Sequence, residues 1–140
     1  MCDRSKYRDI FSLKNKTAFI LGGHGLLGIE ITKAISAYDA KTVVLDVNDH
    51  DNEAFDNVSY KYFDCSSLEK IEEKLLKIIN EEGCPDIFVN CSYPRTSDWS
   101  KNTFQDISLK SYQKNIDIHL NSYVWTARLL ANKMVDVQKE

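Results

Sequence analysis

The segment Leu21-Gly22-Gly23-His24-Gly25-Leu26-Leu27-Gly28 decides how this chain folds, because it joins a short apolar run to a helical pattern. Residues 16–21, just before the glycines, have the length and composition of a buried strand. Residues 25–38 place apolar side chains at helical spacing, namely Leu27, Ile31, Ala34, Ile35 and Tyr38. The segment therefore predicts a tight turn that leads from a strand into a helix.

The rest of the chain continues this alternation of strands and helices. Residues 42–46, 58–63 and 85–90 are predicted strands, whereas residues 48–57 and 92–104 are predicted loops. A helix is predicted after Ser66, opened by a capping box with Glu69 and ended by Gly83. Strands that alternate with helices pair in parallel, because each connection must cross over the sheet. The sequence predicts an α/β fold, a Rossmann-type doubly wound parallel sheet of about four strands, in a single domain over residues 1–140.

The last helical pattern has one continuous apolar face, which we expect to pack in the core. It is formed by Leu109, Tyr112, Ile116, Leu120, Tyr123, Ala127, Leu130 and Met134.

Composition limits the classes of protein to consider. The chain is 43% hydrophobic and 28% charged, with a formal net charge of -3, as in a soluble globular domain. It has no basic stripe, so we expect no nucleic-acid partner. No apolar run approaches the roughly 20 residues of a membrane helix, and the polar N-terminus lacks a signal peptide, so we expect no membrane association and a cytoplasmic location. The four cysteines lack zinc-site spacing, which predicts free thiols, with Cys65 and Cys91 buried, and no metal site.

The glycine spacing also has a chemical interpretation. Gly22, Gly25 and Gly28 follow the pattern G-x-x-G-x-x-G between a strand and a helix, the context of a dinucleotide-binding turn. One glycine permits the tight turn, a second admits the pyrophosphate, and a third lets helix and strand pack closely. The first N–H groups of the helix then bind phosphate. A plain tight turn is the alternative interpretation.

Polar residues at the ends of the predicted strands extend this hypothesis. Asp46 ends the second strand, 18 residues after Gly28, where a carboxylate accepts hydrogen bonds from ribose hydroxyls and repels a 2′-phosphate. This favours NAD over NADP as cofactor, although Asp46 could instead cap the turn before Asn48. Asp64 and Asn90 follow the third and fourth strands at the same edge of the sheet, where each alone could equally be a turn residue.

Together these residues and the segments Asp64-Cys65 and Asn90-Cys91-Ser92-Tyr93 resemble the N-terminal half of a short-chain dehydrogenase/reductase. Leu21 stands where the family usually has threonine, and only the first asparagine of its Asn-Asn-Ala-Gly motif is kept. The resemblance implies that Asp64 contacts the adenine. The cofactor-binding residues that it implies are Gly22, Gly23, Gly25, Leu26, Leu27, Gly28, Asp46, Asp64, Cys65, Asn90, Cys91 and Ser92.

Two further resemblances concern the substrate side. His119 aligns with the asparagine of the family's catalytic tetrad, which holds a water, and a purely structural histidine is the alternative. Residues 89–99 resemble oxidoreductases of bacterial flagellin-modification and surface-sugar pathways (the PtmA type), which handle precursors of nonulosonic acids such as legionaminic acid. That resemblance implies that Arg95 and Trp99 border a polar, sugar-like substrate, with an ordinary surface loop as the alternative.

The family's proton-transfer residues, a serine and a Tyr-x-x-x-Lys motif, are not found. None of the seven tyrosines is followed by lysine four residues later. We therefore expect an NAD-dependent oxidoreductase of this type, acting on a hydroxyl or carbonyl of a small polar or sugar-like substrate, truncated here before its catalytic half. The intact form is expected to be a homo-oligomer. The alternative is a non-catalytic dinucleotide-binding or interaction module that pairs through its last helix.

Overall fold

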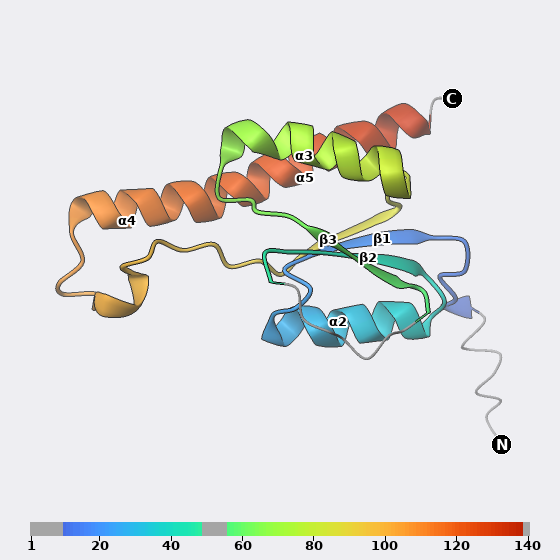
Figure 1. Cartoon of the computed structure of the whole chain (residues 1–140), viewed down its shortest axis with the longest axis horizontal. Coiled ribbons are helices and arrows are strands. Elements are labelled where there is room, and N and C mark those ends of the chain that lie inside the picture. Colours follow the sequence, from blue (N-terminus) through green and yellow to red (C-terminus); the bar gives the residue numbers. More distant parts are fainter. Residues whose placement is uncertain (1–9, 49–55, 139–140) are drawn as a thin grey trace, which may run out of the picture.

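The computed structural model describes residues 10–48 and 56–138, so most of the predicted loop at residues 48–57 lies outside the described residues. Four parallel strands form one sheet in the order β3-β2-β1-β4. They are β1 (Thr17–Leu21), β2 (Lys41–Asp46), β3 (Val58–Tyr62) and β4 (Ile87–Asn90). Helix α2 (Leu26–Ala37) covers one face, and α3 (Leu68–Glu82) and α5 (Ser122–Val137) cover the other (Figure 1). The predicted α/β fold with a four-stranded parallel sheet is confirmed.

The core forms because side chains alternate between the two faces of the central strands. The larger cluster faces α3 and α5 and contains Phe19, Leu21, Val43, Leu45, Phe63, Cys65, Ile71, Leu75, Ile78 and Leu130. Ala18, Ile20 and Val44 are also fully buried, and by alternation they face α2. Each large apolar side chain buried in this way contributes roughly 1.5–3 kcal/mol. The two central strands therefore anchor the fold, whereas the β4 side chains stay half-buried at one edge of the sheet.

Helix α2 packs on the sheet through small residues, which corrects the predicted apolar face. Gly28, Thr32 and Ser36 are buried, whereas Leu27 and Tyr38 are exposed. The reason is that the start of α2 packs directly against the backbone of the glycine turn. A Cβ atom at Gly28 would lie 2.7 Å from Cα of Gly23, which leaves no room for a larger side chain on this face.

The predicted capping box at the start of α3 is wrong. The N-cap of α3 is Ser67, and its side chain makes no capping hydrogen bond. Ser66 lies one residue too early, and its N–H donates instead to Oδ1 of Asp64 at 2.9 Å. The end of the helix is as predicted, since Gly83 is the C-cap with a φ of 91°.

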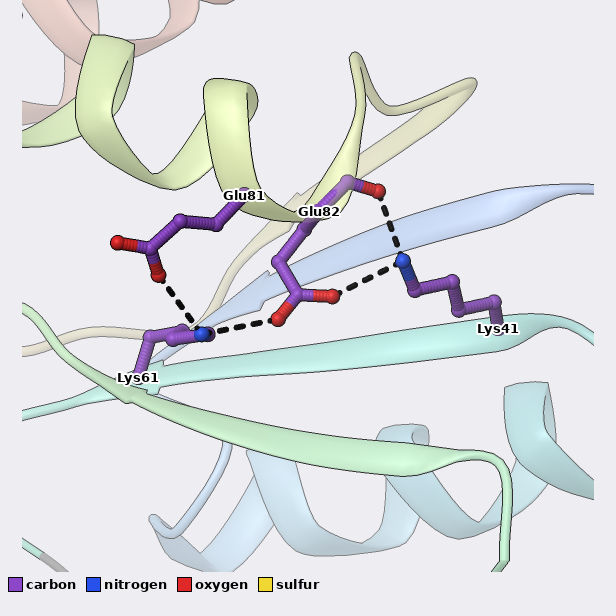
Figure 2. Close-up of polar contacts among 4 residues, drawn as sticks. All are labelled: Lys41, Lys61, Glu81 and Glu82. Carbon is purple, nitrogen blue, oxygen red and sulfur yellow. Dashed lines mark hydrogen bonds and ion pairs between the residues drawn. The ribbon is translucent and has the colours of Figure 1, made fainter.

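The C-terminal turn of α3 is tied to the sheet by ion pairs (Figure 2). Glu82 lies between two lysines, 2.9 Å from Nζ of Lys41 on β2 and 3.0 Å from Nζ of Lys61 on β3. Lys41 also donates to the backbone carbonyl of Glu82 at 2.8 Å, and Lys61 pairs with Glu81 at 2.8 Å. Because Lys61 belongs to an edge strand, this network holds that strand against the helix.

The long C-terminal helix is present, but its apolar face does not pack as predicted. Helix α4 (Leu109–Ile116) runs through a π-helical turn (Asp117–Asn121) into α5. Of the predicted face, Leu109, Tyr112, Ile116 and Leu120 are exposed, and Leu130 is buried. The residues buried in their place are mostly small and polar, namely Ser111, Asn115, Ser122 and Thr126.

The position of α4 explains this difference. Figure 1 shows that α4 extends beyond the carboxyl ends of the strands, the end of the sheet at which α2 begins. No sheet surface therefore lies beneath α4. It contacts the polar loop after β4 instead, where Asn115 bonds with Thr96. Helical periodicity identifies an apolar face but does not say what covers it.

Candidate functional site

The carboxyl ends of the strands border a cleft of about 1070 Å³. The glycine turn, the ends of β2, β3 and β4, and Tyr123 of α5 line it. Every predicted cofactor-binding residue lines this cleft except Gly23 and Gly28, which are buried. The fold therefore brings residues from four separate segments of the chain to one site, where parallel α/β sheets bind ligands.

Two of the glycines are required by the protein itself. Gly22 has a φ of 76°, which disfavours any side chain, and a Cβ there would lie 2.5 Å from the backbone nitrogen of Ser92. A Cβ at Gly28 would collide with the carbonyl group of Gly22. Gly22 shapes the turn, and Gly28 sets the distance between helix and strand. These are two of the structural roles that the glycine motif predicts.

Gly25 differs from the other two. It has an ordinary φ of -72°, and its Cβ would meet only the carbonyl oxygen of Gly22, at 3.3 Å. The protein packing does not demand glycine here, but Gly25 lines the cleft at the N-cap of α2. No side chain caps this helix, and Leu26 is 94% exposed, so the first backbone N–H groups are available to a ligand. These features fit the pyrophosphate of a dinucleotide.

Asp46 is 8% exposed at the end of β2, and both of its carboxylate oxygens accept hydrogen bonds. Oδ2 accepts from the backbone N–H of His24 at 3.0 Å, and Oδ1 accepts from that of Asn48 at 3.1 Å. Asp46 thus caps the turn before Asn48, which was the alternative to a ribose-binding role. Each oxygen can accept a second bond, so the two roles are compatible.

His24 was missed by the sequence reasoning, although it lies inside the glycine segment. Its Nδ1 lies 2.6 Å from the carbonyl oxygen of Asn48, and its ring stacks on Tyr60 with 5.3 Å between centroids. The Tyr60 hydroxyl in turn donates to the carbonyl of Asp46 at 3.1 Å. These contacts join the glycine turn to the ends of β2 and β3. In the sequence, a polar ring between two glycines is the feature that could have pointed to His24.

The end of β3 supplies a carboxylate and a thiol. Burial raises the pKa of Asp64, but the hydrogen bonds from Ser66 outweigh it and leave the pKa below its ordinary value, so Asp64 is ionised. Cys65 is buried, and burial raises the pKa of its thiol, which lies 3.8 Å from Oγ of Ser92. Cys65, Cys84 and Cys91 are free thiols, but Cys91 is only half-buried, contrary to expectation, because it follows the edge strand β4.

The end of β4 is held by its own side chains. Oδ1 of Asn90 accepts from the backbone N–H of Ser92 at 3.0 Å and from its hydroxyl at 2.7 Å. The Tyr123 hydroxyl donates to the carbonyl of Ser92. Nδ2 of Asn90 is buried without a hydrogen-bond partner among the described residues. Tyr123 was predicted to be a core residue, so its place in the cleft was missed.

His119 lies in the π-helical turn and does not line the cleft itself. Its ring makes edge contacts with Tyr93 and Tyr123, at centroid distances of 4.7 and 4.6 Å. Both tyrosines line the cleft, so His119 contacts two side chains of its wall. Arg95 also lines the cleft, whereas Trp99 reaches it through an edge contact with Tyr93.

Residues 16–140 match the short chain dehydrogenase family, and the chain belongs to that family. It is 24% identical over 121 residues to post-translational flagellin modification protein A of Campylobacter coli, an alignment that covers 80% of this chain and 47% of that protein. The predicted family and the resemblance to flagellin-modification proteins are confirmed. The chain spans about half the length of the relatives it matches.

Solved structures share the fold. A short chain dehydrogenase from Leptospira borgpetersenii with bound NAD⁺ superposes with a TM-score of 0.72 at 19% identity, over 93% of this chain and 48% of that one. The 2-keto-3-deoxy-D-gluconate dehydrogenase of Streptococcus agalactiae gives a TM-score of 0.73 at 23% identity, over 96% and 52%. None of the helices in residues 10–48 and 56–138 is long and apolar enough to cross a membrane.

Proposed function

We propose that this chain is the nucleotide-binding half of an NAD-dependent short-chain oxidoreductase. One observation carries the proposal: the glycine turn, the uncapped N-terminus of α2 and the carboxylate of Asp46 meet in a single cleft. This arrangement offers N–H donors to a pyrophosphate and acceptors to ribose hydroxyls. Because a carboxylate repels a 2′-phosphate, Asp46 favours NAD over NADP.

The other cofactor roles follow from position in the cleft. Leu26 and Leu27 would hold the pyrophosphate through backbone N–H groups, and Gly25, whose own N–H donates to the carbonyl of Gly22 at 3.0 Å, would let it approach the helix. Gly22, Gly23 and Gly28 shape the turn. Asp64 and Cys65 border the adenine side, and Asn90, Cys91 and Ser92 lie beneath the remainder of the nucleotide. When bound, NAD accepts a hydride from a substrate carbon, or as NADH returns one to a carbonyl.

The family's Tyr-x-x-x-Lys motif for proton transfer is not found in these 140 residues. We propose that His119, held between Tyr93 and Tyr123, positions a water near the substrate, as implied by its alignment with the tetrad asparagine. An intact enzyme of this type would use the tyrosine and lysine of that motif to exchange the hydroxyl proton, so the chain alone is proposed to bind NAD without turnover.

A small polar or sugar-like substrate is supported by two relatives. One is named for flagellin modification and another for the oxidation of 2-keto-3-deoxy-D-gluconate. The first is similar to this chain in sequence and the second in fold. Of residues 89–99, Tyr93, Pro94 and Arg95 line the cleft.

A second function has its own observation. The exposed apolar side chains of Leu109, Tyr112, Ile116 and Leu120 lie along α4 and the π-helical turn. An exposed face of this kind is typical of an interaction surface. We propose that it pairs with a second copy of the chain, either in a homo-oligomeric enzyme or in a non-catalytic module.

Titration of the purified chain with NADH, followed by NADH fluorescence, tests nucleotide binding. We expect saturable binding that Asp46→Ala weakens about tenfold, since a hydrogen bond to a charged group contributes about 1.5–3 kcal/mol. The control is Lys33→Ala, which removes an exposed ion pair with Glu30 away from the cleft. No saturation at millimolar NADH would refute binding, and tighter binding of NADPH than of NADH would refute the role of Asp46.

A further inference from the structure

The residue Ser92, just beyond the end of β4, is held by two neighbouring parts of the chain. Its backbone lies directly against Gly22, where an added Cβ would come within 2.5 Å of the Ser92 nitrogen. The side chain of Asn90, the last residue of β4, accepts hydrogen bonds from both the N–H and the hydroxyl of Ser92. Ser92 is therefore packed on the glycine turn and tied to the end of its own strand.

A third contact to Ser92 comes from α5, a helix that lies far from β4 in the sequence. The hydroxyl of Tyr123 donates to the backbone carbonyl of Ser92. Burial raises the pKa of Tyr123 above its ordinary 10.0, despite the bond to Ser92, so the hydroxyl keeps its proton at neutral pH and can donate. This bond connects α5 to the point at which the chain leaves the sheet.

The ring of Tyr123 is itself held in place. It makes an edge contact with the ring of His119, with 4.6 Å between centroids. Ser122, the neighbour of Tyr123, is fully buried, and its hydroxyl donates to the carbonyl of His119 at 3.0 Å. Because the ring and the helix beneath it are fixed, the Tyr123 hydroxyl also fixes the direction of the carbonyl that it binds.

That carbonyl belongs to the peptide unit between Ser92 and Tyr93. A peptide unit is planar, so the direction of its carbonyl also sets the direction in which the chain continues. The next residue, Tyr93, precedes Pro94, which restricts Tyr93 to extended backbone conformations. Both Tyr93 and Pro94 line the cleft. The bond from Tyr123 therefore helps to set the course of the chain along this part of the cleft.

This part of the cleft lies across the glycine turn from Asp46. Strand β1, which leads into the turn, pairs with β2 on one side and with β4 on the other. The proposed function assigns the adenosine ribose to Asp46, after β2, and the pyrophosphate to the turn. A dinucleotide crosses such a sheet at the strand where the order reverses, so its second nucleoside half extends toward the end of β4.

We propose that Tyr123 is a positioning residue for the second nucleoside half of a bound dinucleotide. It acts through the carbonyl of Ser92, which it holds so that the end of β4 keeps the shape that this half of the ligand requires. Such pre-organisation lowers the cost of ordering the cleft when the ligand binds. This inference rests on the proposed function, because the adenosine half is taken to lie on the Asp46 side.

Removal of the Tyr123 hydroxyl tests the proposal. Tyr123→Phe keeps the ring that contacts His119 but removes the donor to Ser92. We expect its affinity for NADH, measured by fluorescence titration, to fall about fivefold, as for the loss of one hydrogen bond. Displacement of NADH by ADP measures the affinity for the adenosine half with its two phosphates. That affinity should be unchanged, because ADP lacks the second nucleoside.

Tyr38→Phe is the matched control, because it removes the same hydroxyl group at a different place. Tyr38 is the C-cap of α2, at the end of this helix away from the glycine turn, and does not line the cleft. The affinities of Tyr38→Phe for NADH and for ADP should both equal those of the parent chain.

The two ligands separate a positioning role from a purely structural one. If Tyr123 served only the stability of the fold, folded Tyr123→Phe would bind both ligands as the parent chain does. If its loss distorted the whole cleft, both affinities would fall in the same proportion. Either result would overturn the proposal, and so would equal affinities of the parent chain for NADH and ADP.

The parent chain distinguishes this failure from that of the proposed function. If the parent chain does not bind NADH, the proposed function itself fails. If the parent chain binds NADH saturably and Tyr123→Phe binds it equally well, only the role of Tyr123 is refuted.

Discussion

Nδ1 of His24 donates to the carbonyl oxygen of Asn48 across 2.6 Å, so the glycine turn is bonded to the loop that follows β2. The backbone N–H of His24 binds Oδ2 of Asp46 in the same region. One residue therefore fixes both the carboxylate proposed to bind ribose and the backbone beyond it. Such pre-organisation lowers the entropic cost of binding a ligand.

Replacing His24 with alanine tests this arrangement. The substitution keeps the backbone bond to Asp46 but removes the ring that holds Asn48 and stacks on Tyr60. We expect NADH affinity to fall about fivefold, the equivalent of one hydrogen bond of about 1 kcal/mol. Fluorescence titration measures the effect, with Lys33→Ala as the control. An unchanged affinity would mean that the ring contributes nothing to the cleft.

Alanine at Gly28 and at Gly25 should separate folding from binding. At Gly28 the added Cβ collides with the backbone of Gly22 and Gly23, so we expect a loss of about 1–3 kcal/mol in the free energy of unfolding. At Gly25 the Cβ meets one oxygen at 3.3 Å, so stability should change little while NADH binding weakens.

Urea unfolding and NADH titration of both variants measure these two effects. Equal destabilisation by the two substitutions would show that Gly25 is required for packing and not for a ligand. Unchanged NADH affinity in Gly25→Ala would remove this residue from the proposed phosphate site.

The ion pairs around Glu82 should contribute stability that depends on pH and salt (Figure 2). Glu82→Gln is expected to lower the free energy of unfolding by about 0.5–1 kcal/mol at neutral pH, and less at high salt, because Lys41 and Lys61 are partly exposed. Glu81→Gln is the control and should cost less, since Glu81 is more exposed and contacts only one of these lysines.

The pH dependence of this difference follows from the direction of the pKa shifts. The hydrogen bond with Lys41, and then that with Lys61, lowers the pKa of Glu82 below its ordinary 4.5 despite its burial. The stabilisation is complete above pH 4.5 and is lost as the pH falls through the lower value. Glu81 and then Glu82 raise the pKa of Lys61 above 10.5, so its contribution is lost as the pH rises through the raised value. A difference between Glu82→Gln and the parent that stayed constant from pH 7 to pH 3 would contradict this.

The apolar face of α4 predicts self-association. Ile116→Asp and Leu120→Asp each place a charge on this exposed face, away from the buried Asn115. Sedimentation velocity should show dimers of the parent chain and monomers of both variants, with unchanged far-ultraviolet circular dichroism. Lys110→Asp is a control that changes charge outside the apolar residues. A parent chain that is monomeric at high micromolar concentration would disprove pairing through this face.

Much of the candidate site could be predicted from the sequence because its parts are locally encoded. The spacing of Gly22, Gly25 and Gly28 reflects the steric needs of one strand-to-helix turn. Asp46, Asp64 and Asn90 were placed at one edge because parallel strands end on the same side. His24 and Tyr123 escaped prediction because their partners, Asn48 and the carbonyl of Ser92, lie in other segments of the chain.

The sequence by itself determined the strand and helix pattern, the glycine turn and the family, since these depend on residues close together in the chain. Only the tertiary structure decided which faces of the helices are covered. Small residues bring α2 against the sheet. Helix α4 extends beyond the carboxyl ends of the strands, so its apolar face, which the sequence predicts to be core, is exposed. Burial depends on what lies opposite a side chain, and helical periodicity carries no information about that neighbour.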